Sequence, residues 1–303
     1  MYLLKVIVLA IVQGLAELLP VSSSAHVVVA EKLMGLDPSS PQMTLLLVML
    51  HTGTMFAVII FFSSTWKKTY FSSTESFRRF AFLLLWATLL TGIIGEAIKK
   101  IIEATLFRGA QKAEIEQLFS RLDLIAPALA AAGVLILIAG VLERYQIMNG
   151  VLGSAKDGAL GVKSDTVTFR QAAWMGMVQG LALPFRGFSR SGSTISTGML
   201  VGATKERAEH FSFAMAVVLT PAVVGVEALR LRKASHTAML AGAPMDLKGS
   251  LIFSVLGMGF SFLAGLLALK WLSSWLESGR WYLFGIYCLL ASGVVFYLHA
   301  RGF

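Results

Sequence analysis

Two segments of the chain, ELLPVSSSAH at 17–26 and LPFRGFSRSGST at 183–194, concentrate reactive side chains within an otherwise apolar sequence. The first contains a carboxylate, three consecutive serine hydroxyls and an imidazole, and the second contains a guanidinium surrounded by hydroxyls. A hydroxyl nucleophile, a general base and a fixed cation are the groups that phosphoryl transfer requires. The two segments therefore predict a site that binds and cleaves a phosphate group.

In the first segment, Ser23 is the candidate nucleophile, and either His26 or Glu17 is placed to accept its proton. Gln13 lies four residues before Glu17, so helical spacing puts both side chains on one face, pointing at the break in the segment. Ser22 lies where a second half-helix begins, and the free N–H groups and dipole at such an end favour a bound phosphate. We expect Glu17, Ser23 and His26 to be catalytic and Gln13 and Ser22 to bind phosphate.

In the second segment, Arg190 can bind a phosphate through two parallel N–H bonds and stabilise the charge of the transition state, so we expect it to be catalytic. Three hydroxyls surround it at another expected helix N-terminus, and we expect them to bind phosphate: Ser189, Ser191 and Thr194. Arg186 either reaches the phosphate as well or extends to the membrane surface. We include it among the phosphate-binding candidates.

Structural roles compete with these assignments. Serine and threonine side chains in membrane helices usually bond to their own or a neighbouring helix, so any single hydroxyl here can be structural. Buried charges in a membrane are costly and are kept for a partner or a function, which favours a functional role for Glu17 and Arg190. His51, in the sequence LHTGT, lies within reach of the same site, although such a residue more often packs or meets lipid headgroups.

The sequence excludes the usual zinc and disulfide frameworks. Cys288 is its single cysteine, and the histidines, at positions 26, 51, 210, 236 and 299, include no pair spaced three to five residues apart. A metal ion at this site would be a hard divalent cation, such as Mg²⁺ or Ca²⁺, held by oxygen atoms of Glu17 and of phosphate.

The composition excludes an ordinary soluble protein. Only 14% of the 303 residues are charged, against about 25% in soluble domains, and 56% are apolar, with a mean hydropathy of +0.74. A single water-facing globule cannot bury so much apolar material, so we expect an integral membrane protein. The 26 basic and 17 acidic residues give a net charge of +9, which suits anionic headgroups or an anionic substrate more than nucleic acid.

Segments without charged residues fall into two length classes, which predict the elements that hold the site. Six are long enough to cross the hydrocarbon layer, and with flanking residues the expected spans are 42–66, 79–100, 124–143, 208–230, 249–272 and 281–300. Four are too short to span and form two adjacent pairs, each interrupted by proline and small residues. Each pair predicts a re-entrant helix hairpin, at 1–34 and 168–202, with one of the polar segments at its tip.

The two hairpins resemble each other, because VQGLA occurs at both 12–16 and 178–182. We expect one all-α integral membrane domain over 1–303, built from repeat one at about 1–145 and repeat two at about 168–303. A hairpin followed by three spans reverses the side from which the next repeat enters the membrane. The repeats are therefore expected to have inverted topology, with the two tips meeting near the midplane, as in transporters with broken helices.

Three stretches of the sequence resemble the bacterial undecaprenyl-pyrophosphate phosphatase family of the bacitracin-resistance type. QGLAE at 13–17 and LPVSSSAH at 19–26 are similar to its first signature. GFSRSGST at 187–194 is similar to its second signature, and FSFAMAVVLTPAVVG at 211–225 is similar to the helix that follows. The similarity runs along most of the chain.

The resemblance implies hydrolysis of undecaprenyl pyrophosphate to the monophosphate at the outer face of the bacterial cytoplasmic (inner) membrane, which recycles the lipid carrier for cell-wall synthesis. It also implies dependence on a divalent cation, Mg²⁺ or Ca²⁺. The functional positions of the family fall on Gln13, Glu17, Ser22, Ser23, His26, Ser189, Arg190 and Thr194. Where the family has proline immediately before Gly187, this chain has Arg186, which displaces a rigid turn and adds a cation.

The expected partners are a polyprenyl pyrophosphate lipid, membrane lipids and a second copy of the chain in a homodimer, with no nucleic acid. A different class of function also fits the sequence, because inverted repeats with broken helices are common in transporters. The chain could then be a transporter or flippase of a phosphorylated polyprenyl lipid. Release of phosphate in detergent, where transport is undefined, separates the two interpretations.

Overall fold

The computed structural model describes residues 2–38, 40–106, 121–149, 167–240, 247–276 and 280–303. Within these ranges the chain forms ten helices and no strand. The helices are α1 (Tyr2–Leu18), α2 (Ser23–Leu33), α3 (Pro41–Thr69), α4 (Thr74–Leu106), α5 (Leu122–Met148), α6 (Phe169–Ala182), α7 (Arg190–Leu200), α8 (Lys205–Leu240), α9 (Leu247–Leu276) and α10 (Tyr282–Ala300).

Six of these helices, α3, α4, α5, α8, α9 and α10, are long and apolar enough to cross a membrane. Their apolar windows have mean hydropathies between 1.8 and 2.5. A helix satisfies its own backbone hydrogen bonds, which is the condition for spanning lipid. The expectation of an all-helical, multi-pass membrane protein with six spans is confirmed.

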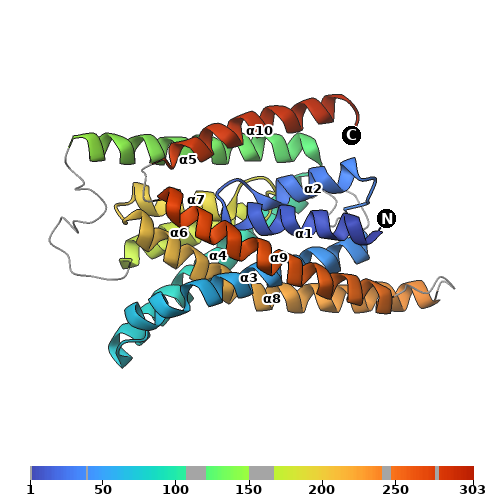
Figure 1. The fold of residues 1–303 in the computed structure, drawn as a ribbon, viewed down its shortest axis with the longest axis horizontal. Coiled ribbons are helices and arrows are strands. Elements are labelled where there is room, and N and C mark those ends of the chain that lie inside the picture. The colour runs from blue at the N-terminus through green and yellow to red at the C-terminus, as the bar shows by residue number, and fades with distance from the viewer. Residues whose placement is uncertain (1, 39, 107–120, 150–166, 241–246, 277–279) are drawn as a thin grey trace.

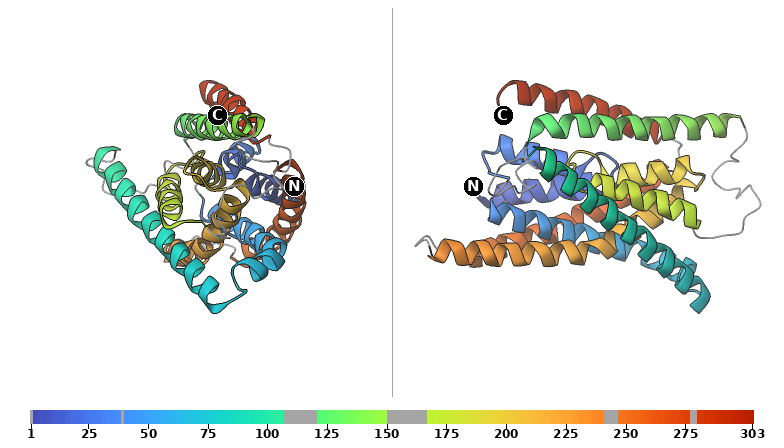
Figure 2. Two further views of the ribbon diagram at one scale, coloured as in Figure 1. Left: turned by 90° about the vertical axis from the view of Figure 1, so that its left-hand side faces the viewer. Right: turned by 180° about the vertical axis from the view of Figure 1, so that it is seen from behind.

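The four short helices form two pairs that point at each other (Figure 1). The α1–α2 pair occupies one end of the long axis and the α6–α7 pair the other, with the loop of each pair in the middle. α5 and α10 run side by side along one flank, and α3, α8 and α9 lie on the opposite flank (Figure 2). The two polar segments of the sequence thus share the centre of the protein.

Both loops start their second helix in the same way. Ser22 and Ser189 have positive φ angles, 67° and 34°, and each side chain caps a helix by accepting from the N–H of Ala25 and Gly192 respectively. A left-handed backbone is unfavourable for serine, so both turns hold strain at corresponding places in the two segments. The N-termini of α2 and α7, with the positive ends of their dipoles, consequently face the centre.

α6 packs on α4 through glycines. A methyl group on Gly176 would lie 2.4 Å from the carbonyl oxygen of Ala87, and one on Gly180 would lie 2.7 Å from that of Thr91. The Thr91 hydroxyl also donates to the Gly176 carbonyl over 2.9 Å. Small residues four positions apart allow two helix backbones to approach this closely in a membrane.

Gly176→Ala is expected to destabilise the protein, because the added methyl group must push α6 away from α4, at a cost of about 1–3 kcal/mol. Gly92→Ala is the matched control on α4, since a methyl group there meets no atom within 4 Å. Thermal unfolding in detergent, followed by circular dichroism, should show a lower midpoint for Gly176→Ala and none of this loss for Gly92→Ala. Equal midpoints for the two variants would contradict the close packing.

One segment of α9 packs against both α1 and α3. A methyl group on Gly14 of α1 would lie 2.5 Å from Ala264 Cβ, and one on Gly53 of α3 would lie 2.3 Å from the carbonyl oxygen of Met258. Ser261, between these two α9 residues, donates a hydrogen bond to a carbonyl of α3 over 2.9 Å. α9 therefore fixes how α1 and α3 lie relative to each other.

Candidate functional site

The two loops meet through an ion pair. Arg190, the first residue of α7, donates from Nη2 to Oε1 of Glu17, near the end of α1. The Glu17 side chain is 6% exposed and that of Arg190 is 23% exposed. A carboxylate so deeply buried requires a charged partner and hydrogen bonds, and this one has both.

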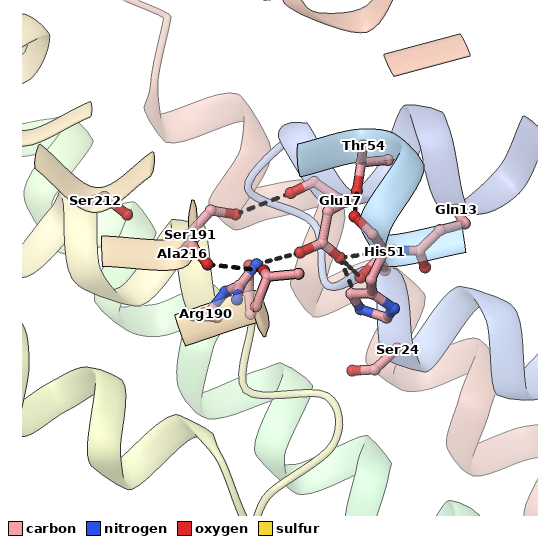
Figure 3. Close-up of polar contacts among 12 residues, drawn as sticks. Gln13, Glu17, Ser24, His51, Thr54, Arg190, Ser191, Ser212 and Ala216 are labelled. Carbon is pink, nitrogen blue, oxygen red and sulfur yellow. Dashed lines mark hydrogen bonds and ion pairs between the residues drawn. The ribbon is translucent and has the colours of Figure 1, made fainter. Parts of the chain in front are cut away.

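Three more side chains contact the other carboxylate oxygen of Glu17 (Figure 3). Ser23 Oγ donates to Oε2, Gln13 Nε2 donates to it over 2.9 Å, and His51 Nε2 lies 3.2 Å from it. Oε2 is therefore in position to take the Ser23 proton. The surrounding donors and Arg190 favour the ionised carboxylate, which is the form that can act as a base.

Hydrogen bonds hold the two loops together around this cluster. The Gly187 N–H donates to Ser24 Oγ over 3.2 Å, and Ser191 Oγ donates to the backbone carbonyl of Glu17 over 3.4 Å. Ser191 and Ser24 lie on either side of the Glu17 carboxylate in Figure 3. Each loop thus depends on the other for its position.

A pocket of about 340 Å³ opens onto the cluster. Polar residues of both loops contribute to its lining, together with apolar residues of α3 and α8, among them Leu47, Val48, Leu219, Val223 and Val224. A pocket whose lining combines charged and polar groups with aliphatic side chains suits an amphipathic ligand.

Comparison with known proteins places almost the whole chain in one family. The sequence model described as bacitracin resistance protein BacA matches residues 6–294, nearly the whole chain. The chain belongs to the BacA family. The family expected from the two signatures is thereby confirmed.

Curated relatives of this BacA-family chain are similar over almost their full length. An undecaprenyl-diphosphatase 2 of Acinetobacter baylyi is 56% identical over 296 residues, covering 97% of each chain. An undecaprenyl-diphosphatase of Desulfosudis oleivorans is 32% identical, covering 97% of this chain and 98% of the relative. An undecaprenyl-diphosphatase 2 of Burkholderia thailandensis is 31% identical, covering 93% and 92%.

The remaining phosphate-binding candidates are divided between the pocket and the packed interior. Ser22, Ser189, Ser191 and Arg186 line the pocket with the Glu17 cluster. The hydroxyls of Ser22 and Ser189 are engaged as helix caps, so these residues shape the turns that present the N–H groups of α2 and α7. Arg186, where the BacA family was expected to have proline, adds a guanidinium to a lining that also contains Arg190 and Arg230.

Of the two proton acceptors expected for Ser23, the structure brings only Glu17 to it within the described residues. His26 turns away. Its Nδ1 lies 2.7 Å from the Ser22 carbonyl oxygen, and its Nε2 lies 2.7 Å from the hydroxyl of Tyr287 on α10, whose ring stacks on the imidazole. These contacts hold the ring against its own turn and α10, so the expected catalytic role of His26 stays a prediction.

Thr194 also lies elsewhere than expected. Its Oγ1 donates to the Arg190 carbonyl over 2.8 Å and lies 2.5 Å from the Ser212 hydroxyl of α8. The side chain is fully buried and does not line the pocket. Thr194 lies one helical turn beyond Arg190, inside the packing of α7 on α8, and joins these helices; its contact with phosphate stays a prediction.

Two residues of the cluster were not among the expected site residues. From the sequence, His51 was expected either to reach the site or to pack and meet headgroups, and Ser24 belongs to the serine run. Neither role could be read from spacing, because His51 reaches Glu17 from α3 and Ser24 contacts a loop more than 160 residues away. The one available signal was that both are polar residues in apolar surroundings.

The pocket does not form a ready binding site for a resident metal ion. Among the described residues, no three His, Cys, Asp or Glu side chains lie together, and Glu17 is the one carboxylate in the pocket lining. Its oxygens are already contacted by a guanidinium, a hydroxyl, an amide and an imidazole. Mg²⁺ and Ca²⁺ take about six or more oxygen ligands, so Glu17 by itself does not fit the expected cation.

Proposed function

We propose that this chain is an undecaprenyl-diphosphatase, which hydrolyses undecaprenyl diphosphate to the monophosphate and inorganic phosphate. The observation that carries the proposal is the contact of Ser23 with a buried Glu17–Arg190 pair in the lining of a partly apolar pocket. The names of the three relatives support the same activity. The product would return the lipid carrier to cell-wall synthesis.

In the proposed reaction, Ser23 Oγ attacks the terminal phosphorus while Glu17 Oε2 takes its proton. The bond from that phosphorus to the bridging oxygen breaks, and undecaprenyl monophosphate leaves with the bridging oxygen. Water then attacks the phosphoserine, Ser23 Oγ recovers the proton from Glu17, and inorganic phosphate leaves.

Arg190 serves two partners in this reaction. In the free protein it pairs with Glu17. A bound diphosphate offers it a bidentate partner, to which the N–H groups at the N-termini of α2 and α7 add. When Arg190 turns to the phosphate, Glu17 loses a cation and becomes a stronger base at the moment the substrate is in place.

The apolar residues of the pocket lining give the isoprenoid chain a place beside the reacting groups. Leu47 and Val48 of α3 and Val223 and Val224 of α8 line it. A polyprenyl chain contacting these residues stays in an apolar environment, while its diphosphate reaches the polar loops.

Phosphate release by the purified protein in detergent tests the proposed function directly. With undecaprenyl diphosphate or the shorter farnesyl diphosphate as substrate, we expect inorganic phosphate and the lipid monophosphate to appear in equal amounts. No release by the wild-type protein with either lipid, with divalent cation present, would overturn the proposal.

The divalent cation, Mg²⁺ or Ca²⁺, is proposed to enter with the diphosphate, because Glu17 offers it too few oxygens beforehand. Chelation with EDTA is expected to abolish phosphate release, and added cation is expected to restore it. Isothermal titration of the protein with Mg²⁺ or Ca²⁺ alone should show no binding heat. Tight binding of the cation alone, lost in Glu17→Gln, would contradict this proposal.

We also propose an inverted repeat of two halves, each with a re-entrant hairpin, placed in the bacterial inner membrane with the pocket facing outward. Gly14 of α1, in the first half, packs on α9 of the second half. Gly180 of α6, at the corresponding place in the second half, packs on α4 of the first half, and this reciprocal packing supports the symmetry. A cysteine introduced at Thr44, which lines the pocket, should be labelled on intact cells by a membrane-impermeant reagent if the orientation is outward. The homodimer stays a prediction.

A further inference from the structure

We propose that His51 is a positioning residue, which holds the Glu17 carboxylate in the orientation that takes the proton from Ser23. The inference rests on the proposed phosphatase function and deepens it, because it assigns a role to a residue of α3 outside the two loops. His51 Nε2 lies 3.2 Å from Oε2, the same oxygen to which Ser23 donates.

The imidazole of His51 is itself fixed. Its Nδ1 lies 2.8 Å from the Leu47 carbonyl oxygen, one turn earlier on α3. One ring nitrogen is thus anchored to the helix backbone and the other faces the carboxylate. Both partners are acceptor oxygens, so the ring makes both contacts as hydrogen bonds when each nitrogen carries a hydrogen. A ring held in this way can define the position of its partner, because rotation about its side-chain bonds breaks one of the two contacts.

α9 keeps the backbone of α3 around His51 and the backbone of α1 around Glu17 at a fixed separation. Gly53, two residues after His51, and Gly14, three residues before Glu17, both lie against the same α9 segment, too close for a methyl group. Ser261 of that segment donates to the Leu50 carbonyl over 2.9 Å, immediately before His51. The separation of imidazole and carboxylate is therefore set by packed backbone.

His51 supplies an anchor that the other partners of Glu17 cannot. Gln13 is on the same helix as Glu17, four residues earlier, so it moves with α1. Arg190 is drawn to the diphosphate in the proposed reaction and gives up Oε1. His51, on a separate helix, then remains as the contact that ties Oε2 to the rest of the protein beside Ser23.

Two substitutions of His51 separate this role from packing. His51→Leu removes the N–H donor but keeps an apolar side chain of similar size, and we expect kcat to fall about 10- to 100-fold, the range spanned by hydrogen bonds to charged groups, with KM nearly unchanged. His51→Gln keeps an N–H of similar reach and is expected to restore kcat to within a few-fold of wild type. Steady-state phosphate release in detergent gives both constants.

A third variant tests whether His51 acts through Glu17. His51→Leu added to Glu17→Gln should cause little further loss, because the carboxylate that His51 positions is already gone. Full additivity of the two losses, a loss in KM alone, or equal losses in His51→Leu and His51→Gln would overturn the inference. Thermal unfolding and size-exclusion chromatography of each variant show whether the fold is retained.

Failure of the inference is distinguishable from failure of the proposed function. If the wild-type protein releases no phosphate, the proposed function fails. If the wild-type protein is active and His51→Leu keeps its kcat, the function stands and only the positioning role of His51 is rejected.

Discussion

Arg190→Ala is expected to lower kcat/KM for undecaprenyl diphosphate by about 10³- to 10⁵-fold, the range found when a phosphoryl-transfer enzyme loses its transition-state arginine. Arg190 lines the pocket and is the cation paired with Glu17, so it is the side chain placed to receive the charge that develops on the terminal phosphate. Its planar fork can hold two phosphate oxygens at once. Release of inorganic phosphate in detergent measures the loss.

Two further variants show whether this loss reflects the guanidinium or the fold. Arg190→Lys keeps the charge without the fork and should recover only a small part of the activity. Arg144→Ala, on the exposed side of α5 where Arg144 bonds to the Tyr282 hydroxyl, lies outside the pocket and should be near wild type. Because Arg190→Ala strands a buried carboxylate, its thermal midpoint must be compared with that of wild type. A loss below 10-fold in a folded Arg190→Ala protein would contradict the proposed role.

Those parts of the fold that depend on local composition were predictable from the sequence. Spans follow from apolar segments of sufficient length, and the breaks between short helices follow from proline, glycine and serine at their ends. The approach of the two polar segments was expected from the duplication of VQGLA and from the three spans that follow each hairpin, whereas the pairing of Glu17 with Arg190 was not predicted. These inferences use only length, charge and internal similarity.

The contacts of individual side chains across helices were not predictable. Spacing places His26 and Ser23 near each other on α2, yet it does not show that Tyr287 of α10 lies beside the imidazole. It likewise cannot show that His51 of α3 lies beside Glu17, since that contact depends on how α9 packs on α1 and α3. Side chains from different helices meet only as a result of tertiary packing, for which a single sequence holds no direct signal.

Ser23→Ala is expected to lower kcat by about 10⁴-fold or more, as loss of a covalent nucleophile does in other enzymes. The substitution removes the Oγ that donates to Glu17 and leaves the ion pair of Glu17 with Arg190 in place, so binding of the diphosphate should be affected far less than kcat. Ser63→Ala, on α3 where the hydroxyl bonds only to its own helix within the described residues, is the matched control.

The outcome of Ser23→Ala decides between two routes of hydrolysis, in both of which Glu17 Oε2 is the base. In one route Ser23 attacks the phosphorus, and in the other water attacks it directly. A folded variant that keeps activity within about 10-fold would exclude a phosphoserine, because the remaining base would then have to activate water. Acid quenching of wild-type protein during turnover, followed by mass spectrometry of the peptide containing Ser23, provides an independent test, since a covalent route places phosphate on that hydroxyl. Loss of activity in Ser23→Ala together with phosphate on Ser23 in the wild type would establish the serine as the nucleophile, and the carboxylate to which it donates is that of Glu17.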